Sequence, residues 1–159
     1  MSAPDYLGAP CARLILYLPH RPEGSEAGWR VPTAQGIIAH NSNHWRKILT
    51  LLAKVASPVA GQWRGFRDSE LFVETALCFQ PELQRGDRWH WIAGQANLQR
   101  FARVEQGGLT HPEDPQIAVD VRRKLLLSPY PDYRQLSNAR VARIRGMLAQ
   151  SGFYAEEGG

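Results

Sequence analysis

The sequence predicts an α/β protein with three layers, in which a mostly parallel, four-stranded central sheet lies between helices. Three observations lead to this expectation: short apolar runs, amphipathic helical segments between them, and a length of 159 residues. Short apolar strands that alternate with helices are typical of parallel sheets covered on both faces. Because a domain usually holds about 100–200 residues, we expect residues 1–159 to form a single α/β domain with a frayed tail at 155–159.

The first strand and the first helix are the clearest elements. Residues 13–18 form an apolar run that ends at Pro19, and a loop rich in proline, glycine and charge follows. This pattern indicates a buried strand that opens into a loop. The side chains of Asn41 and Ser42 offer oxygens that cap a helix, and apolar residues then recur at helical spacing. We therefore predict a helix over 43–56.

The middle of the chain predicts two more strands. Residues 72–79 mix β-branched, aromatic and aliphatic side chains, and residues 89–93 form a short aromatic strand before a tight glycine turn and a helix over 95–103. Residues 80–87 are fewer than the dozen or so that a parallel crossover normally needs. Either this crossover is extended, or one of the two strands is antiparallel.

The last third of the chain alternates loops with regular elements. The glycines and prolines of 107–115 predict a surface loop, 116–123 a short helix and 124–127 the fourth strand. The two prolines in 128–132 exclude a helix there and favour a rigid loop. Ser137 then caps a last helix with an apolar stripe.

Positive charge is concentrated near the end of the chain. The segment 122–145 has a net charge of +6 and the remaining residues −2, within a total of +4. Its basic residues are Arg122, Arg123, Lys124, Arg134, Arg140, Arg143 and Arg145. Such a segment attracts the phosphates of nucleic acid without needing sequence recognition. The alternative is a basic helix that simply faces solvent.

Candidate site residues follow the strands, because ligands of open α/β sheets bind beyond the carboxyl ends of the strands. The rigid loop from 128 presents aromatic, acidic and basic side chains, and the start of the first helix favours an anion. The alternatives are a structural turn and plain helix capping. The predicted ligand-binding residues are His20, His40, Asn41, Asn43, His44, Tyr130, Asp132, Tyr133, Arg134 and Asn138.

Arg134 directly follows the rigid loop, so we expect its guanidinium at the mouth of the site. A planar fork with five donors grips a phosphate or carboxylate in a bidentate manner. The competing interpretation is an internal ion pair with Asp132 or with an acid of another loop.

Several chemistries are not indicated. The sequence has no Gly-x-Ser-x-Gly and no glycine-lysine phosphate loop. His40 and His44 have the i, i+4 spacing of a metal pair without an evident third ligand, so we expect neither a metal nor a cofactor, and the catalytic residues stay unknown.

Cys11 and Cys78 suit a reducing compartment. Without a signal peptide or a long apolar run, we expect a cytoplasmic protein that does not contact membranes.

The order of these segments resembles the uracil-DNA glycosylase superfamily. The matching stretches are Leu14–Pro19, Gly36–Leu52, Phe72–Pro81, Trp89–Phe101 and Leu125–Leu148. Asn-His-Trp-Arg-Lys at 43–47 and the run at 129–138 also resemble a small uncharacterised bacterial family. The resemblance implies a glycosylase-like fold. The glycosylases carry an acid or amide after the first strand and a histidine after the last, whereas this chain has no carboxylate there before Glu23 and no histidine in 128–132.

These observations lead to two functional hypotheses from different classes. The first is a glycosylase-like protein that binds a nucleic acid or a nucleotide through a basic cleft, with uncertain catalysis. The second is a non-catalytic interaction or scaffold protein whose basic last helix meets an acidic partner. Hydrolysis of a small phosphorylated metabolite is a third and weaker hypothesis, which depends only on the anion site at the helix start.

Overall fold

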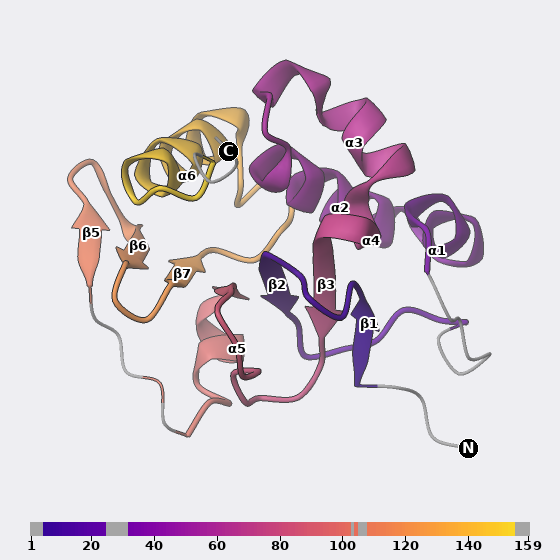
Figure 1. Ribbon diagram of the computed structural model, residues 1–159, viewed down its shortest axis with the longest axis horizontal. Helices are drawn as coiled ribbons and strands as arrows, with labels where there is room; N and C mark the ends of the chain where they lie inside the picture. The colour runs from indigo at the N-terminus through magenta and orange to yellow at the C-terminus, as the bar shows by residue number, and fades with distance from the viewer. Residues whose placement is uncertain (1–4, 25–31, 103, 105–107, 155–159) are drawn as a thin grey trace.

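The computed structural model describes residues 5–24, 32–102, 104 and 108–154, and it has one mixed sheet with helices on both faces (Figure 1). The seven strands run in the order β1-β3-β2-β4-β7-β6-β5 across the sheet. They are β1 Tyr6–Gly8, β2 Leu14–Tyr17, β3 Thr75–Cys78, β4 Trp89–Ala93, β5 Leu109–His111, β6 Asp114–Asp120 and β7 Leu125–Ser128. The helices are α1 Ala34–His40, α2 Asn43–Ala56, the 3-10 turn η2 Ala60–Gln62, α3 Trp63–Ser69, α4 Leu71–Glu74, α5 Gln95–Leu98 and α6 Asn138–Gln150.

The sheet combines a parallel centre with antiparallel edges. β2 pairs in parallel with β3 and β4, and β4 pairs in parallel with β7. β1 joins one edge in antiparallel orientation, and the β5–β6 hairpin extends the other. The mixed α/β class is therefore confirmed, but the expectation of a mostly parallel sheet of four strands is wrong: the sheet has seven strands, with three parallel and three antiparallel pairings. All four predicted strands exist, although the second begins at Thr75, after the helical turn α4.

The orientation of β4, which the sequence left open, is parallel to both of its neighbours. β3 and β4 lie on opposite sides of β2, so the connection between them must pass across β2. This connection contains no helix: residues 79–88 make it as an extended loop. Of the two alternatives, the extended crossover is the correct one.

The region after residue 107 differs most from expectation. The expected loop over 107–115 contains β5, and the expected short helix over 116–123 is wrong because most of this segment is the strand β6. Ile117 and Val119 are buried two positions apart, which is the period of a strand rather than of a helix. β6 takes this form because β7 lies beside it and offers a ladder of hydrogen bonds.

The two long helices agree with expectation and the short one does not. α2 spans the predicted 43–56, but the predicted side-chain cap is wrong, because Ser42 makes no capping hydrogen bond and Asn41 bonds to Glu23 instead. α6 begins at a cap in which the Ser137 side chain accepts from the backbone N–H of Arg140. The helix expected over 95–103 ends at Leu98, and the chain continues in i, i+3 turns that carry Phe101 into the core. Residue 103 and the tail 155–159 lie outside the described residues.

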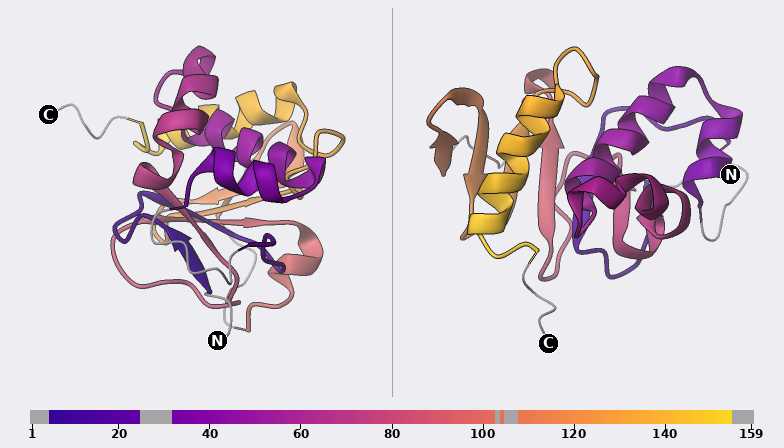
Figure 2. Two further views of the ribbon diagram at one scale, coloured as in Figure 1. Left: turned by 90° about the vertical axis from the view of Figure 1, so that its right-hand side faces the viewer. Right: turned by 90° about the horizontal axis from the view of Figure 1, so that it is seen from above.

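Alternate side chains of β2 build two apolar cores. Leu14 and Leu16 pack under the helices, while Ile15 and Tyr17 face the opposite side with α5. Figure 2 shows helices α1 to α4 and α6 gathered over one face of the sheet. Among the described helices, none combines the length and apolar character needed to cross a membrane.

Candidate functional site

The candidate site lies at the carboxyl ends of β2, β4 and β7. β2 and β4 are neighbours, yet the chain leaves β2 toward β3 on one side and leaves β4 toward β7 on the other. Neighbouring parallel strands with connections in opposite directions form a topological switch point, where open α/β sheets bind their ligands. The fold thus places the loops that follow these strands at the position where ligands usually bind.

Three side chains from separate segments meet at this edge and form the cluster His20–Tyr130–His44. The hydroxyl oxygen of Tyr130 lies 3.1 Å from Nε2 of His20 and 3.1 Å from Nε2 of His44. The His44 and Tyr130 rings stack with an angle of 6° between them. Trp45, almost fully buried, meets the ring of His20 edge-on. The three polar side chains are half-buried, so solvent still reaches the cluster.

Local structure explains how each side chain reaches the cluster. His20 follows β2, and His44 lies in the first turn of α2. Asn41 holds the loop after His20: its side chain accepts from the backbone N–H of Glu23 and donates to the carbonyl of Glu23. The Tyr130 ring packs against Gly94, where a Cβ would lie 3.5 Å from the ring, and the φ of +95° at this position favours glycine.

The loop that carries Tyr130 is fixed by its own hydrogen bonds. The indole N–H of Trp91 on β4 donates to Ser128 Oγ at the end of β7, and Ser128 Oγ–H donates to the carbonyl of Pro129. Asp132 accepts the backbone N–H of Arg134 with its carboxylate and that of Leu136 with its carbonyl. These bonds support the predicted rigidity of the loop and leave the Tyr130 hydroxyl at the strand ends.

Burial shifts the proton affinities of two groups in the cluster. It raises the pKa of Tyr130 to about 12, and the Asp132 carboxylate adds to this shift. Burial also lowers the pKa of His20 from its ordinary value, with a further contribution from His44. At neutral pH Tyr130 is therefore a phenol that can donate, and His20 is a neutral imidazole that can accept a proton.

The geometry of the cluster permits proton transfer between the two histidines. A phenol has one O–H to donate and lone pairs to accept with, so Tyr130 can donate to one Nε2 while it accepts from the Nε2–H of the other histidine. Once one histidine has taken up a proton and become an imidazolium, reversing both bonds passes a proton through the Tyr130 oxygen to the other imidazole. Such an arrangement can supply a proton at one end and remove one at the other, which is general acid–base chemistry.

A cavity of about 520 Å³ lies on the other side of Gly94, between the β4–α5 turn and the β5–β6 hairpin. Its apolar floor includes Ile92 and Leu127, and its polar lining includes residues with side-chain amides and a hydroxyl. These polar residues are Gln95, Gln116, Gln135 and Thr110. Its volume lies within the range of about 300–1,000 Å³ that is usual for small-molecule sites. Gly94 and Pro129 form the boundary between this cavity and the cluster.

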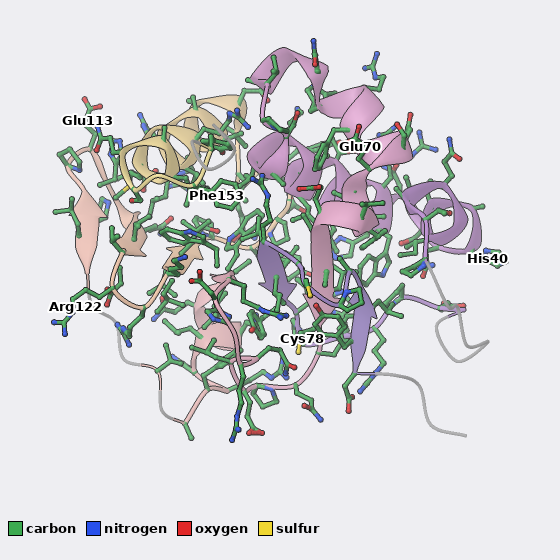
Figure 3. The ribbon with its side chains drawn as sticks, viewed as in Figure 1. His40, Glu70, Cys78, Glu113, Arg122 and Phe153 are labelled. Carbon is green, nitrogen blue, oxygen red and sulfur yellow. The ribbon has the colours of Figure 1, made fainter. Side chains whose placement is uncertain are left out.

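Three of the predicted site residues lie outside the cluster. His40 ends α1, where its Nδ1 lies 2.9 Å from the carbonyl of Gly36, and it projects from the rim of the molecule (Figure 3). Asn138 accepts from the Lys54 ammonium and so joins α6 to α2. Asn43 is exposed at the first position of α2. These side chains are not part of the cluster.

Tyr133 and Arg134 are exposed beyond the cluster. Tyr133 is 44% exposed and lies beside Lys47 of α2. Asp132 uses its carboxylate on the backbone N–H of Arg134, and within the described residues no ion pair engages the Arg134 guanidinium. The internal ion pair with Asp132 considered from the sequence is therefore wrong, while anion binding by Arg134 stays a prediction.

Most cations of the basic segment 122–145 have partners within the protein, so the segment offers less positive charge to phosphates than its composition indicates, and a phosphate-facing surface there stays a prediction. Arg140 and Arg143 pair with Asp114, whose side chain is only 4% exposed. Arg145 donates to carbonyls at the end of α2 and stacks on Tyr154. Arg123 and Lys124 also form ion pairs. Apart from Asp120, which lies three residues before Arg123, these partners are distant in sequence, so counting charges along the chain could not reveal them.

His40 and His44 are four residues apart but do not share one helical face. The chain leaves the helical conformation at Asn41 and Ser42, so the two histidines belong to different helices. No group of three His, Cys, Asp or Glu side chains able to hold a metal ion occurs within the ranges that the structure describes.

The sequence predicted the three residues of the cluster but missed residues that line the cavity. His20, His44 and Tyr130 were candidates because each follows a predicted strand or begins a predicted helix. The cavity residues Thr110 and Gln116 were missed, because the hairpin that carries them was interpreted as a loop and a helix. The alternation of large apolar side chains along β6 was the sequence signal that could have identified this strand and its cavity residues.

Comparison with known proteins gives a family but no activity. A family model described as "Family of unknown function (DUF6942)" matches residues 5–149. No curated protein matches the chain, and no solved structure does.

Proposed function

Because the chain belongs to DUF6942, a family of unknown function, we propose its function from the site itself: it binds a nucleotide with the base in the cavity beside Gly94, and the cluster His20–Tyr130–His44 acts on it by acid–base catalysis. The observation that carries this proposal is the position of a ligand-sized cavity next to a proton-sharing cluster at the switch point of the sheet.

The lining of the cavity supports a planar heterocyclic ligand. An apolar floor favours the faces of a base, and side-chain amides at the rim present both donors and acceptors to its polar edge. Glutamine side chains read adenine and other bases in this way in protein–nucleic acid complexes. Gly94 lines the cavity and the Tyr130 ring packs against the same glycine, so a ligand in the cavity lies next to the residue whose hydroxyl belongs to the cluster.

The proton affinities support hydrolysis of the bound nucleotide. Neutral His20 can take a proton from an attacking water, and the second histidine can give one to the leaving group through the reversal of the Tyr130 bonds. Cleavage of the bond between base and sugar by one water, which releases the free base, is the reaction that the glycosylase-like resemblance implies. The uracil-DNA glycosylase relationship is part of this proposal.

The scaffold hypothesis receives less support. It depended on a basic last helix that meets an acidic partner, and Arg140, Arg143 and Arg145 of that helix are already engaged within the protein.

Calorimetric titration with nucleoside monophosphates, and with ribose 5-phosphate as the ligand without a base, tests the binding. We expect binding that requires the base and that Ala118→Leu weakens about tenfold, because Ala118 lines the cavity and is only half-buried. Ala149→Leu on the exposed surface of α6 is the matched control. Equal binding of ribose 5-phosphate, or no binding of any nucleotide, would contradict the proposal.

A further inference from the structure

A second surface, apart from the cavity and the cluster, combines aromatic rings with cations. Trp63 of α3 and Tyr133 of the loop before α6 each have cations over their rings. The Lys54 ammonium lies between them, 5.0 Å from the Trp63 ring centre and 5.8 Å from that of Tyr133. Arg64 and Arg67 lie over Trp63 at 5.0 and 5.5 Å, and Lys47 lies over Tyr133 at 5.6 Å.

We infer that this aromatic–cation strip, made of Lys47, Tyr133, Lys54, Trp63 and Arg64, binds single-stranded nucleic acid. The rings of Trp63 and Tyr133 contact four cations, so this surface brings aromatic faces and positive charge together.

The charge of the strip is less neutralised than that of the basic segment 122–145. α2 contributes Arg46, Lys47 and Lys54 and contains no acidic residue. Asp68 of α3 pairs with Arg67, and the Asp132 carboxylate accepts a backbone N–H of its own loop. Arg64 is exposed. The strip therefore offers positive charge to an anionic partner, whereas Arg140 and Arg143 of α6 are already bound to Asp114.

The interleaving of rings and cations favours a nucleic acid strand over an acidic peptide. Bases stack on aromatic side chains in any sequence, while cations a few ångströms away contact the phosphates. A cation that leaves the face of Trp63 or Tyr133 can pair with the phosphate of the base that replaces it. Tyr133 is 44% exposed, and a duplex, whose bases are stacked inside, could not use this ring.

The strip also adjoins the proposed active site. Lys47 and His44 lie on the same helix, and Tyr133 follows Tyr130 in the same loop. A strand on the strip could thus lead one of its nucleotides to the cluster His20–Tyr130–His44. This deepens the proposed function by naming a polymeric ligand, although binding on the strip does not require the cavity.

Fluorescence anisotropy with a labelled oligothymidylate at several salt concentrations tests the inference. We expect Tyr133→Ala to weaken binding about tenfold, which corresponds to the loss of one stacked base. Arg64→Gln should lower both the affinity and the salt dependence, as loss of one phosphate contact does. Arg122→Gln removes the same charge from an exposed position at the other end of the molecule, near β6, and should change little (Figure 3).

Two competitors complete the test. Unlabelled duplex and polyglutamate of the same charge should both compete more than tenfold less well than unlabelled oligothymidylate. Equal competition by polyglutamate, or equal loss in Arg64→Gln and Arg122→Gln, would overturn the inference and indicate general charge attraction. Tyr133→Ala should leave the binding of nucleoside monophosphates in the cavity unchanged, so failure of the nucleotide site and failure of the strip are distinguishable. The unfolding midpoint of each variant shows whether it is folded.

Discussion

The Tyr17–His90 pair and the cluster His20–Tyr130–His44 use the same two side-chain types in different surroundings. Tyr17 and His90 face the α5 side of the sheet, and their side chains are 0% and 6% exposed. The Tyr17 oxygen accepts the backbone N–H of Gln84, so its own proton is available to His90 Nδ1, 2.7 Å away. The cluster lies at the carboxyl ends of the central strands, where its rings are only half-buried.

This difference separates a structural proton arrangement from one that can take part in chemistry. In the buried pair, the tyrosine oxygen is bonded on both sides and no solvent reaches it, so its proton has one position. At the edge, the Tyr130 oxygen faces two histidines that are accessible to solvent and to ligands. Burial, more than residue type, decides which histidine–tyrosine contact is a candidate catalytic group.

The largest expected effect concerns acid stability and the buried pair. Burial, with a smaller effect of Arg88, lowers the pKa of His90 to about 4. Between pH 6.5 and 4 the unfolded chain binds a proton that the native protein does not, so stability falls with pH over this window. At about 1.4 kcal/mol for each pH unit, the loss is about 3 kcal/mol. Urea unfolding from pH 7.5 to 4 measures it.

The control for this effect is His90→Gln, which removes the titrating group. Its unfolding free energy should decrease less than that of the wild type as the pH falls through the same window. Parallel curves for the two proteins would show that His90 is not the group responsible.

Removing each tyrosine hydroxyl sharpens the comparison at neutral pH. Tyr17→Phe leaves the buried His90 Nδ1 without its partner, and a buried unsatisfied group costs about 1–3 kcal/mol. Tyr130→Phe should cost less than about 1 kcal/mol, because water can replace the hydroxyl at a half-exposed site. Chemical denaturation compares the two variants. A larger loss of unfolding free energy in Tyr130→Phe than in Tyr17→Phe would show that the cluster His20–Tyr130–His44 has a structural role.

Substitution of the edge histidines should separate function from stability. We expect His20→Gln and His44→Gln to change the unfolding free energy by less than about 1 kcal/mol, as is usual for partly exposed positions. If the proposed function holds, both variants bind nucleotide but lose base release. His40→Gln, on the rim of the molecule, is the matched control for both readouts. Normal turnover in His20→Gln would remove this residue from the reaction.

The smallest expected effect is a difference in titration between the two histidine environments. Imidazole nitrogen shifts measured by NMR should give a midpoint near 4 for His90. The midpoint of His20 should lie below the ordinary histidine value of about 6.5 because of burial and of His44. Tyr130→Phe should change the His20 midpoint and leave that of His90 unchanged. A change of both the His20 and the His90 midpoint in Tyr130→Phe would mean that the two environments are coupled.

The sequence by itself determined the elements with strong local signals. The apolar runs predicted the four central strands, and a capping side chain with helical periodicity predicted α6 from Ser137. It also identified His20, His44 and Tyr130, because residues after parallel strands gather at one edge of a sheet. These features depend on properties that neighbouring residues share, so they can be recognised without knowledge of the rest of the chain.

Only the tertiary structure decided which distant groups meet. Residues 116–120 form a strand because β7 lies beside them, and Arg140 and Arg143 of α6 form ion pairs because the chain buries Asp114, more than 20 positions earlier, against them. The 3.1 Å contacts of Tyr130 with the two histidines span 110 and 86 residues of sequence. Pairings of this kind depend on where the folded chain brings its segments together, and no local pattern of charge or hydrophobicity records that position.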